Sequence, residues 1–422
     1  MRSPVLMVMS RWSMEDMSPK QCCSEPRRRQ AGLSIVEMMV GMVIGLIASL
    51  VIMQSFSSSE AYRRNISGSG DALQSAAIAA QRLDLIIQEG GSGLARGGQW
   101  VWGCRLLASF SGNVVLPSAS AYPSPFASVP QTLRAVPAAI IDGGDKSDVI
   151  ITMAGDSASG NKGLAFSSAT GDSMVVQTPT IGMILKTSAA AAAYDLLLAV
   201  PRKIADDPGD CRVVQAAKTM TAPVMTADAS LGFKVATFSK LVPLNTLTYG
   251  TIESSIYEKS PAAFHLGLRD NPNFTMLGVN SDSELLQYDL LKRFDTQVVG
   301  ENVFLIKARY GLDNGVGGDI NDNAVDEWVS PSESGWTLAD LMDGKLATQQ
   351  RIGYVKAIRI AMVVRSSQPI ASDAPMTSIK LFQDLASARQ FSRTLTSDEQ
   401  RYQYQAYEWV IPLRNMRTPP NI

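Results

Sequence analysis

The sequence holds a single histidine, His265, among its 422 residues, and this scarcity narrows the chemistry open to the chain. It contains no G-x-S-x-G nucleophile motif and no G-x-x-x-x-G-K-[ST] phosphate loop. Neither a serine hydrolase nor a P-loop motor is therefore indicated. Because His265 lies among apolar neighbours, we expect it to be structural, and we expect the protein not to be an enzyme.

Charged residues are also few, at 18% of the chain, and the formal net charge is -1. Outside the N-terminus there is no block of Lys and Arg, and binding to a phosphate backbone requires such clusters. Nucleic acid is therefore not an expected partner. The length predicts one large elaborated domain or two smaller ones.

Proline is absent between Pro26 and Pro117, which permits a long helix. Within this stretch, 17 of the 24 residues from 33 to 56 are apolar, and Glu37 is the only charged one. As a helix this run would be about 36 Å long, enough to cross a bilayer. The arginines at 27–29 place its N-terminal side in the cytoplasm. A buried core helix is the alternative, which the unbroken apolarity disfavours.

The order of the basic cluster, the small residues and the apolar run is the reverse of a secretory signal. A secretory signal has its small-residue cleavage site after the apolar region. Here the pair Ala31-Gly32 comes before it. Cleavage at this pair would remove the basic residues and leave the apolar segment on the mature protein.

The stretch AGLSIVE resembles the type III signal of type IV pilins and related pseudopilins. The resemblance implies a prepilin leader over residues 1–32, with Gly32 as its last residue and Leu33 as the first mature residue. It implies a prepilin peptidase as a partner, which cuts after Gly32 and methylates the new amine. The protein would then be a single-pass protein of the bacterial inner membrane, with a cytoplasmic N-terminus and a periplasmic C-terminal domain.

In this family the fifth mature residue, here Glu37, is implied to meet the terminal amine of a neighbouring subunit during assembly. A carboxylate inside a membrane helix costs about 2.5–3.5 kcal/mol on insertion scales, so a charged partner is expected. The alternative is a solvated Glu37 at the headgroup boundary. Gly41 and Gly45 form a GxxxG motif, which permits close helix packing, although glycine is common in membrane helices generally.

Beyond the membrane segment, the helix is expected to continue over residues 57–90. A bend or melted turn is expected at Gly68 and Gly70, which each cost about 1 kcal/mol relative to Ala. A helical repeat of apolar residues predicts one buried face after this point. The repeat consists of Leu73, Ala76, Ala80, Leu83 and Ile87.

The rest of the chain is predicted to form strands and long loops. Residues 116–137 are rich in proline and serine without periodicity, which predicts a loop. Short strands are predicted in DVIITM, SMVVQTP and AYDLLLAV, and a short helix in WTLADLMDGKL. Alternation predicts a half-buried strand in NVFLIKARYGLD and another strand in YVKAIRIAMVVR. RYQYQAYEWVIPLRN is predicted to close the sheet, with a bulge near Ala406 where its alternation changes phase.

The expected fold class is α+β, as the resemblance to pilins implies. A long N-terminal helix, membrane-spanning in its first half, packs on a C-terminal antiparallel β-sheet domain with large insertions. The motifs GQWVWGC, ARYGLD and LRN resemble the PilW-type minor pilins. The expected parts are a transmembrane and assembly helix at 33–56, a periplasmic β-rich region with an insertion at 91–300, and a C-terminal sheet region of the same domain at 301–422.

Four cysteines are present, of which Cys22 and Cys23 leave with the leader. The other two, Cys104 and Cys211, belong to a domain that would face an oxidising periplasm, so a disulfide is expected. Closing a loop of about 107 residues is worth about 4–5 kcal/mol as an upper estimate. Two free buried thiols are the alternative, and a zinc site is not expected from so few ligands.

The loop DNGVGGDINDNAVDE resembles a calcium-binding loop. Asp319, Asn321, Asn323 and Glu327 could direct their oxygens toward one hard cation. Ala324 stands where the expected turn glycine would be, and two aspartates are replaced by asparagine. The alternative is a solvated turn. Calcium is thus the one cofactor hypothesis, and no cofactor is required.

These features predict a minor pilin that primes or caps type IV pilus assembly, inserted by its N-terminal helix after cleavage. The expected partners are the prepilin peptidase, other minor and major pilins, a tip adhesin and the inner membrane. The final location would be the pilus or its tip at the cell surface. The alternatives are a minor pseudopilin of a type II secretion system and a pilus-tip adhesin. Glu37 argues against the large K-type pseudopilins, which commonly lack this acid.

Overall fold

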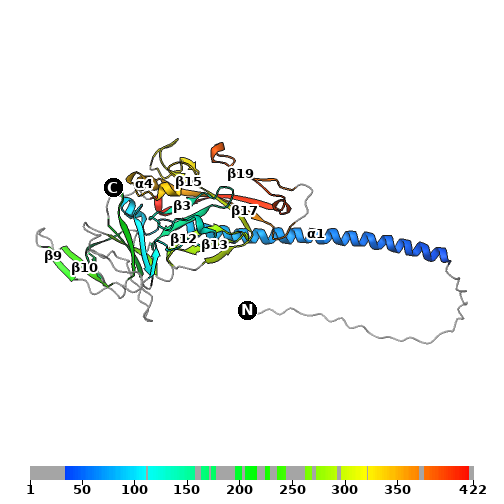
Figure 1. Ribbon diagram of the computed structural model, residues 1–422, viewed down its shortest axis with the longest axis horizontal. Helices are drawn as coiled ribbons and strands as arrows, with labels where there is room; N and C mark the ends of the chain where they lie inside the picture. The colour runs from blue at the N-terminus through cyan, green and yellow to red at the C-terminus, as the bar shows by residue number, and fades with distance from the viewer. Residues whose placement is uncertain are drawn as a thin grey trace, which may run out of the picture. The chain divides into compact units, whose positions relative to one another are not determined.

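The computed structural model (Figure 1) describes most of the chain from residue 34 onward. The described residues are 34–110, 113–156, 163–170, 173–176, 195–201, 205–215, 224–228, 235–243, 262–268, 272–291, 296–320, 322–369 and 375–417. The chain divides into two compact units, Met1–Glu60 and Ala61–Ile422. Gly32, Leu33 and Asn321 lie outside the described residues.

The N-terminal helix α1 spans Ile35–Gln88, or 54 residues. It stays helical through Gly68 and Gly70, so the prediction of a melted turn is wrong. Gly68 is buried, and a Cβ atom placed on it would lie 3.7 Å from the Oγ of Ser367. Packing at this point offsets the low helix propensity of glycine, because tertiary contacts routinely outweigh propensity.

The second half of α1 carries an apolar face within the core of the second unit. Its buried residues are Ala72, Ala76, Ala79, Leu83 and Ile87. The prediction is therefore correct for Ala76, Leu83 and Ile87. It is wrong for Leu73, which is 53% exposed, and Ala80 is only partly buried. The buried positions are three or four residues apart, which keeps them on one side of a helix with 3.6 residues per turn.

A nine-stranded sheet holds most of the strands between residues 105 and 268, in the order β2-β1-β8-β7-β11-β5-β6-β10-β9. The strands are β2 (Asn113–Leu116), β1 (Arg105–Phe110), β8 (Asp210–Gln215), β7 (Asp195–Val200), β11 (Ala262–Leu268), β5 (Leu164–Thr170), β6 (Ser173–Val176), β10 (Val235–Pro243) and β9 (Val224–Asp228). Of its neighbouring pairs, β1 and β8 run parallel and the others antiparallel. The predicted strands in SMVVQTP and AYDLLLAV are β6 and β7.

A five-stranded antiparallel sheet has the order β14-β13-β12-β4-β3. Its strands are β14 (Thr296–Gly300), β13 (Leu285–Asp289), β12 (Asn273–Val279), β4 (Val149–Ala154) and β3 (Ala138–Ile141). The strand predicted in DVIITM is β4, and it is buried at every position. Full burial explains why this strand is a continuous apolar run rather than an alternating one.

The C-terminal part forms a four-stranded antiparallel sheet in the order β16-β15-β17-β20. Its strands are β16 (Glu327–Val329), β15 (Val303–Leu312), β17 (Val355–Arg365) and β20 (Tyr404–Pro412). The prediction that β15 is half-buried is wrong, because only Phe304 on it is not fully buried. One face of the sheet packs on the main core, and the hairpin of β18 (Ser378–Leu381) and β19 (Phe391–Thr394) covers the other.

The predicted bulge in β20 is also wrong. The strand pairs with β17 without a shift in register, from Tyr404 opposite Arg365 to Pro412 opposite Ala357. The phase of alternation changes because both faces of the strand carry aromatic residues. Tyr404 lies on the side of the β18–β19 hairpin, 4.9 Å from the ring of Phe304, whereas Trp409 packs against the main core.

Short helices connect the strands. The helix predicted in WTLADLMDGKL is α3 (Leu338–Leu341), and α4 (Leu346–Ile352) follows it. Thr337 caps α3 by accepting the N–H of Asp340, which is the usual role of threonine at a helix start. The 3-10 helices are η1 (Ala95–Trp100), η2 (Phe126–Ser128), η6 (Ser387–Arg389), η7 (Glu399–Arg401) and η8 (Arg414–Arg417). The predicted loop at 116–137 is confirmed as mostly irregular chain; the exceptions are Leu116 at the end of β2, η2, and an isolated β-bridge between Arg134 and Arg105.

Candidate functional site

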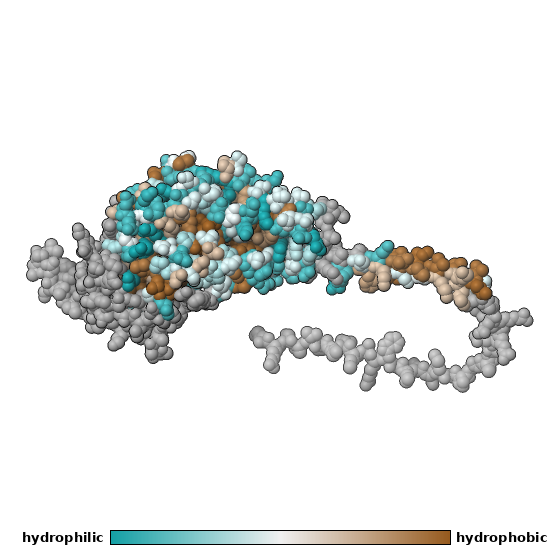
Figure 2. All heavy atoms as spheres, in the orientation of Figure 1, coloured by the Kyte–Doolittle hydropathy of each residue, from teal (hydrophilic) through white to brown (hydrophobic). Residues whose placement is uncertain are grey.

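The first half of α1 exposes a continuous apolar surface, and contact between this surface and water is unfavourable. The segment Ile35–Ser57 is strongly apolar, and no part of it is buried within the protein. Their large apolar side chains are 51–79% exposed, and Figure 2 shows them gathered along this part of the helix. At 1.5 Å per residue the segment is about 35 Å long, which matches a bilayer. The segment is long and apolar enough to anchor the chain in a membrane.

The start of α1 has an N-capping serine, Ser34, and an acidic residue in its first turn, Glu37. The N–H of Val36 donates to Oγ of Ser34 at 3.3 Å, and Glu37 lies in the first helical turn. Ser34 and Glu37 have the spacing of a capping box, S-x-x-E, which the sequence prediction overlooked. A carboxylate here is favoured by the positive end of the helix dipole. Glu37 is exposed, so its side chain is accessible to a charged group outside this chain.

Gly41 and Gly45 leave room beside the helix. A Cβ atom placed on either glycine would meet no atom within 4 Å. Oγ of Ser49 donates to the carbonyl of Gly45 at 2.8 Å, so this hydroxyl is satisfied within the helix. Helix packing at this motif stays a prediction, as do the cleavage and methylation at Gly32 and Leu33.

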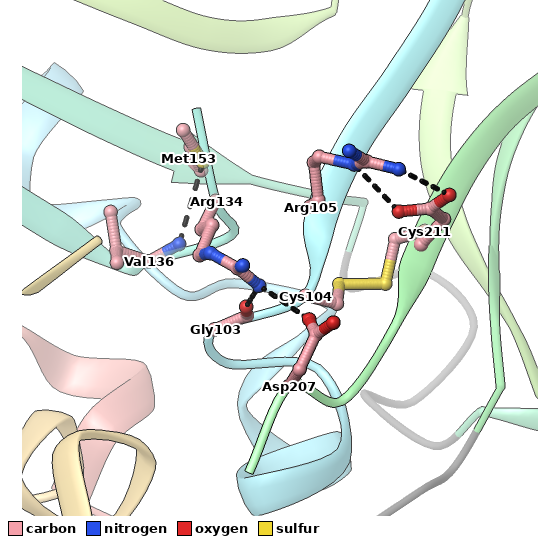
Figure 3. Close-up of a disulfide and its surroundings, with 9 residues drawn as sticks. Gly103, Cys104, Arg105, Arg134, Val136, Met153, Asp207 and Cys211 are labelled. Atoms are coloured by element: carbon pink, nitrogen blue, oxygen red, sulfur yellow. Dashed lines mark hydrogen bonds and ion pairs between the residues drawn. A yellow bond between two sulfur atoms is a disulfide. The ribbon is translucent and has the colours of Figure 1, made fainter. Parts of the chain in front are cut away.

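Cys104 and Cys211 form the predicted disulfide (Figure 3). Their Cα atoms are 5.6 Å apart, within the normal range for a disulfide, and both side chains are fully buried. Cys104 directly precedes β1, and Cys211 lies on the parallel strand β8. The bond therefore joins two strands that are neighbours in the nine-stranded sheet but about a hundred residues apart along the chain.

Two ion pairs flank this disulfide (Figure 3). Arg105 donates from Nε and Nη2 to the two carboxylate oxygens of Asp210, at 2.7 and 2.9 Å. These hydrogen bonds raise the pKa of the Arg105 guanidinium. Arg134 donates from Nη1 to the carbonyl of Gly103 at 2.8 Å and to Asp207 at 3.2 Å. Both pairs join the chain around β1 to the chain around β8, as the disulfide does.

The candidate calcium loop is held in place by its own backbone contacts. Asp326 accepts the N–H groups of Asn314 and Gly315 through Oδ2, at 2.9 and 2.6 Å. Asp313 accepts the N–H of Asn323 through Oδ2 at 2.9 Å. Asn323 has a φ of 66°, a left-handed conformation that asparagine tolerates well. The sequence prediction did not single out Asp313 or Asp326.

The four predicted calcium ligands are not gathered into one site by the described residues. Asp319 is exposed, and Asn321 lies outside the described residues. Both carboxylate oxygens of Glu327 are engaged, one by Arg389 at 2.9 Å and the other by Asn314 at 2.8 Å. Calcium binding here would require Glu327 to exchange these partners, and it stays a prediction.

His265 lies on β11 and is 6% exposed. Its Nδ1 is 3.6 Å from Oδ2 of Asp156. The backbone is joined at the same place, because the N–H of Asp156 donates to the carbonyl of His265 at 2.9 Å. These contacts join β11 to the end of β4, which is a structural role.

Two family models match the chain. The model described as "Type IV Pilus-assembly protein W" matches residues 292–415, which include the four-stranded sheet and the β18–β19 hairpin. The model described as "Prokaryotic N-terminal methylation motif" matches residues 27–53, which include the arginine cluster and most of the exposed segment Ile35–Ser57. No curated protein and no solved structure matches the chain.

Proposed function

The chain is a PilW-type protein of type IV pili, and from this premise we propose that it is a minor pilin that primes or caps pilus assembly. The observation that carries the proposal is the exposed apolar helix Ile35–Ser57, which lies within and just beyond the methylation motif. Such a surface requires either lipid or the helices of other subunits around it. A pilin meets both environments in turn.

Maturation is the first step of the proposed role. The prepilin peptidase would cut between Gly32 and Leu33 and methylate the new amine. The chain would wait in the inner membrane with its second unit in the periplasm. The buried disulfide between Cys104 and Cys211 supports this compartment, because disulfides persist in oxidising environments.

Docking into the fibre is the second step. The methylated amine of Leu33 stays positively charged, and in hydrocarbon it requires a negative partner as much as Glu37 requires a positive one. A carboxylate in a membrane helix costs about 2.5–3.5 kcal/mol on insertion scales, and pairing with an amine of a neighbouring subunit offsets this cost. The exposed position of Glu37 in the first turn suits a partner from another chain. In this role the protein acts mechanically and catalyses no reaction.

The role at the start or tip of the fibre concerns the second unit. Its partners would be other minor pilins, the major pilin and a tip adhesin. At 422 residues, this chain would add a bulky domain to each position it occupies, which suits a few copies at one end.

The test is a deletion of the gene in a piliated host, complemented with the full chain carrying an epitope tag in an exposed loop. We expect few pili in the deletion strain, restored pili on complementation, and immunogold label confined to one end of each fibre. Label spread along the whole fibre would contradict the priming and capping role. Normal numbers of pili in the deletion strain would contradict an assembly role altogether.

A further inference from the structure

Three turns of the second unit meet around a cavity of about 650 Å³. One turn joins β3 to β4, another joins β12 to β13, and the third segment runs from β19 to η7. The segment at 124–128 around η2, the start of β15 with Phe304, and the end of β17 with Arg365 complete the lining. A cavity of this volume has the size of a small-molecule site, and nothing in the proposed assembly role uses it.

Backbone hydrogen bonds fasten the walls of the cavity to one another. The N–H of Val303 donates to the carbonyl of Ser283 at 2.8 Å, which fixes the β12–β13 turn to β15. The N–H of Arg365 donates to the carbonyl of Asn302 at 3.0 Å, which fixes the end of β17 to the start of β15. The site is therefore formed before any ligand arrives, as small-molecule sites usually are.

Buried Lys307 holds the turn between β3 and β4. Its Nζ donates to the carbonyls of Gly144 and Lys146, at 2.9 and 3.2 Å, and also contacts Asp148. It donates to Asp142 at 3.2 Å as well. Burial alone would raise the pKa of Asp142, but the charge and hydrogen bond of Lys307 outweigh burial and hold that pKa below its ordinary value. Asp142 is therefore ionised and already paired.

Of the two arginines in the lining, Arg365 is the one available to a ligand. Arg393 pairs with Glu399 at 2.6 Å, whereas Arg365 has no carboxylate partner among the described ion pairs. The guanidinium of Arg365 instead lies over the ring of Tyr402, 4.8 Å from its centroid. This contact with Tyr402 restrains the guanidinium, and a half-buried guanidinium favours a carboxylate, whose two oxygens can accept two parallel hydrogen bonds.

The charge of the whole lining limits what that ligand can be. Three cationic side chains, Lys146, Arg365 and Arg393, are balanced by three anionic ones, Asp142, Asp145 and Glu399. A polyanion would be repelled by the acids, so one negative charge is the most that this cavity accommodates well. The remaining polar side chains of the lining are the amide of Asn280 and several hydroxyl groups, such as those of Ser124, Ser128 and Ser281. Together with the exposed carboxylate of Asp145, these groups can exchange hydrogen bonds with ligand hydroxyls.

We propose that this cavity binds an acidic sugar, a hydroxyl-rich ring with one carboxylate, and that Arg365 binds the carboxylate. Uronic acids and sialic acids share this chemistry. The ligand site is independent of the helix that anchors and docks the chain, so it adds a recognition function to the second unit. It would remain even if the position of the protein in the fibre differed from the one proposed above.

The test uses the full chain purified in detergent micelles, with binding measured by saturation-transfer NMR and calorimetry. The probes are sodium D-glucuronate, N-acetylneuraminate, neutral D-glucose, N-acetyl-L-aspartate and inorganic phosphate. We expect one of the two acidic sugars to bind at least ten times more tightly than glucose, phosphate or N-acetyl-L-aspartate. The stronger of the two identifies the source as a uronic or a sialic acid.

Variants locate the site. Arg365→Gln should weaken binding of the acidic sugar at least tenfold, whereas Arg414→Gln, at an exposed arginine outside the lining, should not change it. Ser281→Trp places a bulky side chain at the exposed rim and should abolish binding without touching the core. This second variant keeps the test decisive if Arg365→Gln lowers the melting temperature.

Each contrary result overturns the proposal. Binding of glucose as tight as that of the acidic sugars would show that Arg365 does not bind a carboxylate. Tighter binding of phosphate would show a general anion site, and equal binding of N-acetyl-L-aspartate would show a site for acidic side chains of a protein. Unchanged binding in Ser281→Trp would place the ligand elsewhere, and no binding of either sugar at tens of millimolar would leave the cavity without this function.

Discussion

The two halves of α1 share one helix and have opposite surroundings. From Ile35 to Ser57 the helix buries nothing within the protein, and its apolar side chains point outward on every side. From Ala72 to Ile87 the same helix buries one narrow face in the core of the second unit. The first half contains almost only apolar residues, and the second half mixes alanine and leucine with charged and amide side chains.

This difference predicts that mutations in the two halves of the helix have separate effects. Substitutions in the first half should alter insertion, processing and assembly, because nothing in the folded second unit depends on those side chains. Substitutions in the second half should alter the free energy of unfolding. Each experiment below tests whether this division holds.

The largest effect is expected at the end of the leader. Replacing Gly32 by a bulky residue such as Trp should block cleavage almost completely, because a large side chain would not fit where the peptidase accepts glycine. The precursor should then run unshifted on a gel beside wild type. Mass spectrometry of the mature N-terminus gives the same answer at higher resolution, and a chain that still begins at Leu33 would contradict the cleavage assignment.

Glu37→Ala should leave membrane insertion intact and reduce surface pili about tenfold, since one lost ion pair of about 1.4 kcal/mol corresponds to a factor of ten. Pili counted by electron microscopy are the readout. Glu37→Gln is the matched variant, because it keeps the size of the side chain and loses the charge. Piliation as in wild type for both variants would refute the docking role. A lowered melting temperature of the second unit would break the separation between the two halves.

In the second unit, replacing both Cys104 and Cys211 by Ala should lower the free energy of unfolding by about 2–5 kcal/mol, because the open loop gains entropy in the unfolded chain. Thermal unfolding followed by circular dichroism measures the loss. Wild type treated with a reductant strong enough to reach the buried bond should approach the variant. Non-reducing peptide mapping that found two free thiols would contradict the bond itself.

Ala79→Leu compares the two halves directly. Ala79 is fully buried, and a Cβ atom on Gly300 would lie 2.6 Å from its Cβ, so the added carbon atoms have no space. Overpacking of this kind costs about 1–3 kcal/mol. Ala48→Leu, in the exposed first half, is the matched control and should leave the melting temperature of the protein unchanged. Equal effects of the two substitutions would mean that both halves are packed alike.

The smallest effect is expected from calcium. Because Arg389 and Asn314 already occupy both oxygens of Glu327, millimolar Ca²⁺ should raise the melting temperature only slightly over a chelator control. Glu327→Gln should remove whatever rise occurs, whereas Asp282→Asn, at an exposed acid of another turn, should not. A rise of several degrees at micromolar calcium would show a far better site than these contacts suggest.

The N-terminal helix, the disulfide and several strands could be predicted from the sequence because each depends on a local pattern or on compartment. An unbroken apolar run without proline predicts α1, and period-two alternation predicts β17. The burial of β15 on both faces could not be predicted, because it depends on the hairpin of β18 and β19, which is distant in sequence. Alternation of apolar and polar residues in a strand predicts that one face is buried. A segment from later in the chain can bury the other face as well.

The order of the nine-stranded sheet and the cavity beside Arg365 could not be predicted for a related reason. The parallel pairing of β1 with β8 brings together residues about a hundred positions apart, and no short-range pattern encodes such a pairing. Arg365 ends a strand that is visible in the sequence. Its availability depends on where two separate segments, the β3–β4 turn and the chain around η7, place Asp142, Glu399 and Tyr402.

The covalent link between Cys104 and Cys211 also bears on how the molecule would respond to tension. In the proposed role, tension would enter through the helix while a neighbouring subunit held the outer domain. The sequence separation of the two cysteines is 107 residues, a stretch that would extend to roughly 360 Å if it unravelled, at about 3.4 Å per residue. Because the bond would carry the load across this stretch, a pulling force could not lengthen it, and the strands after Cys211 would stay close to the helix along the chain.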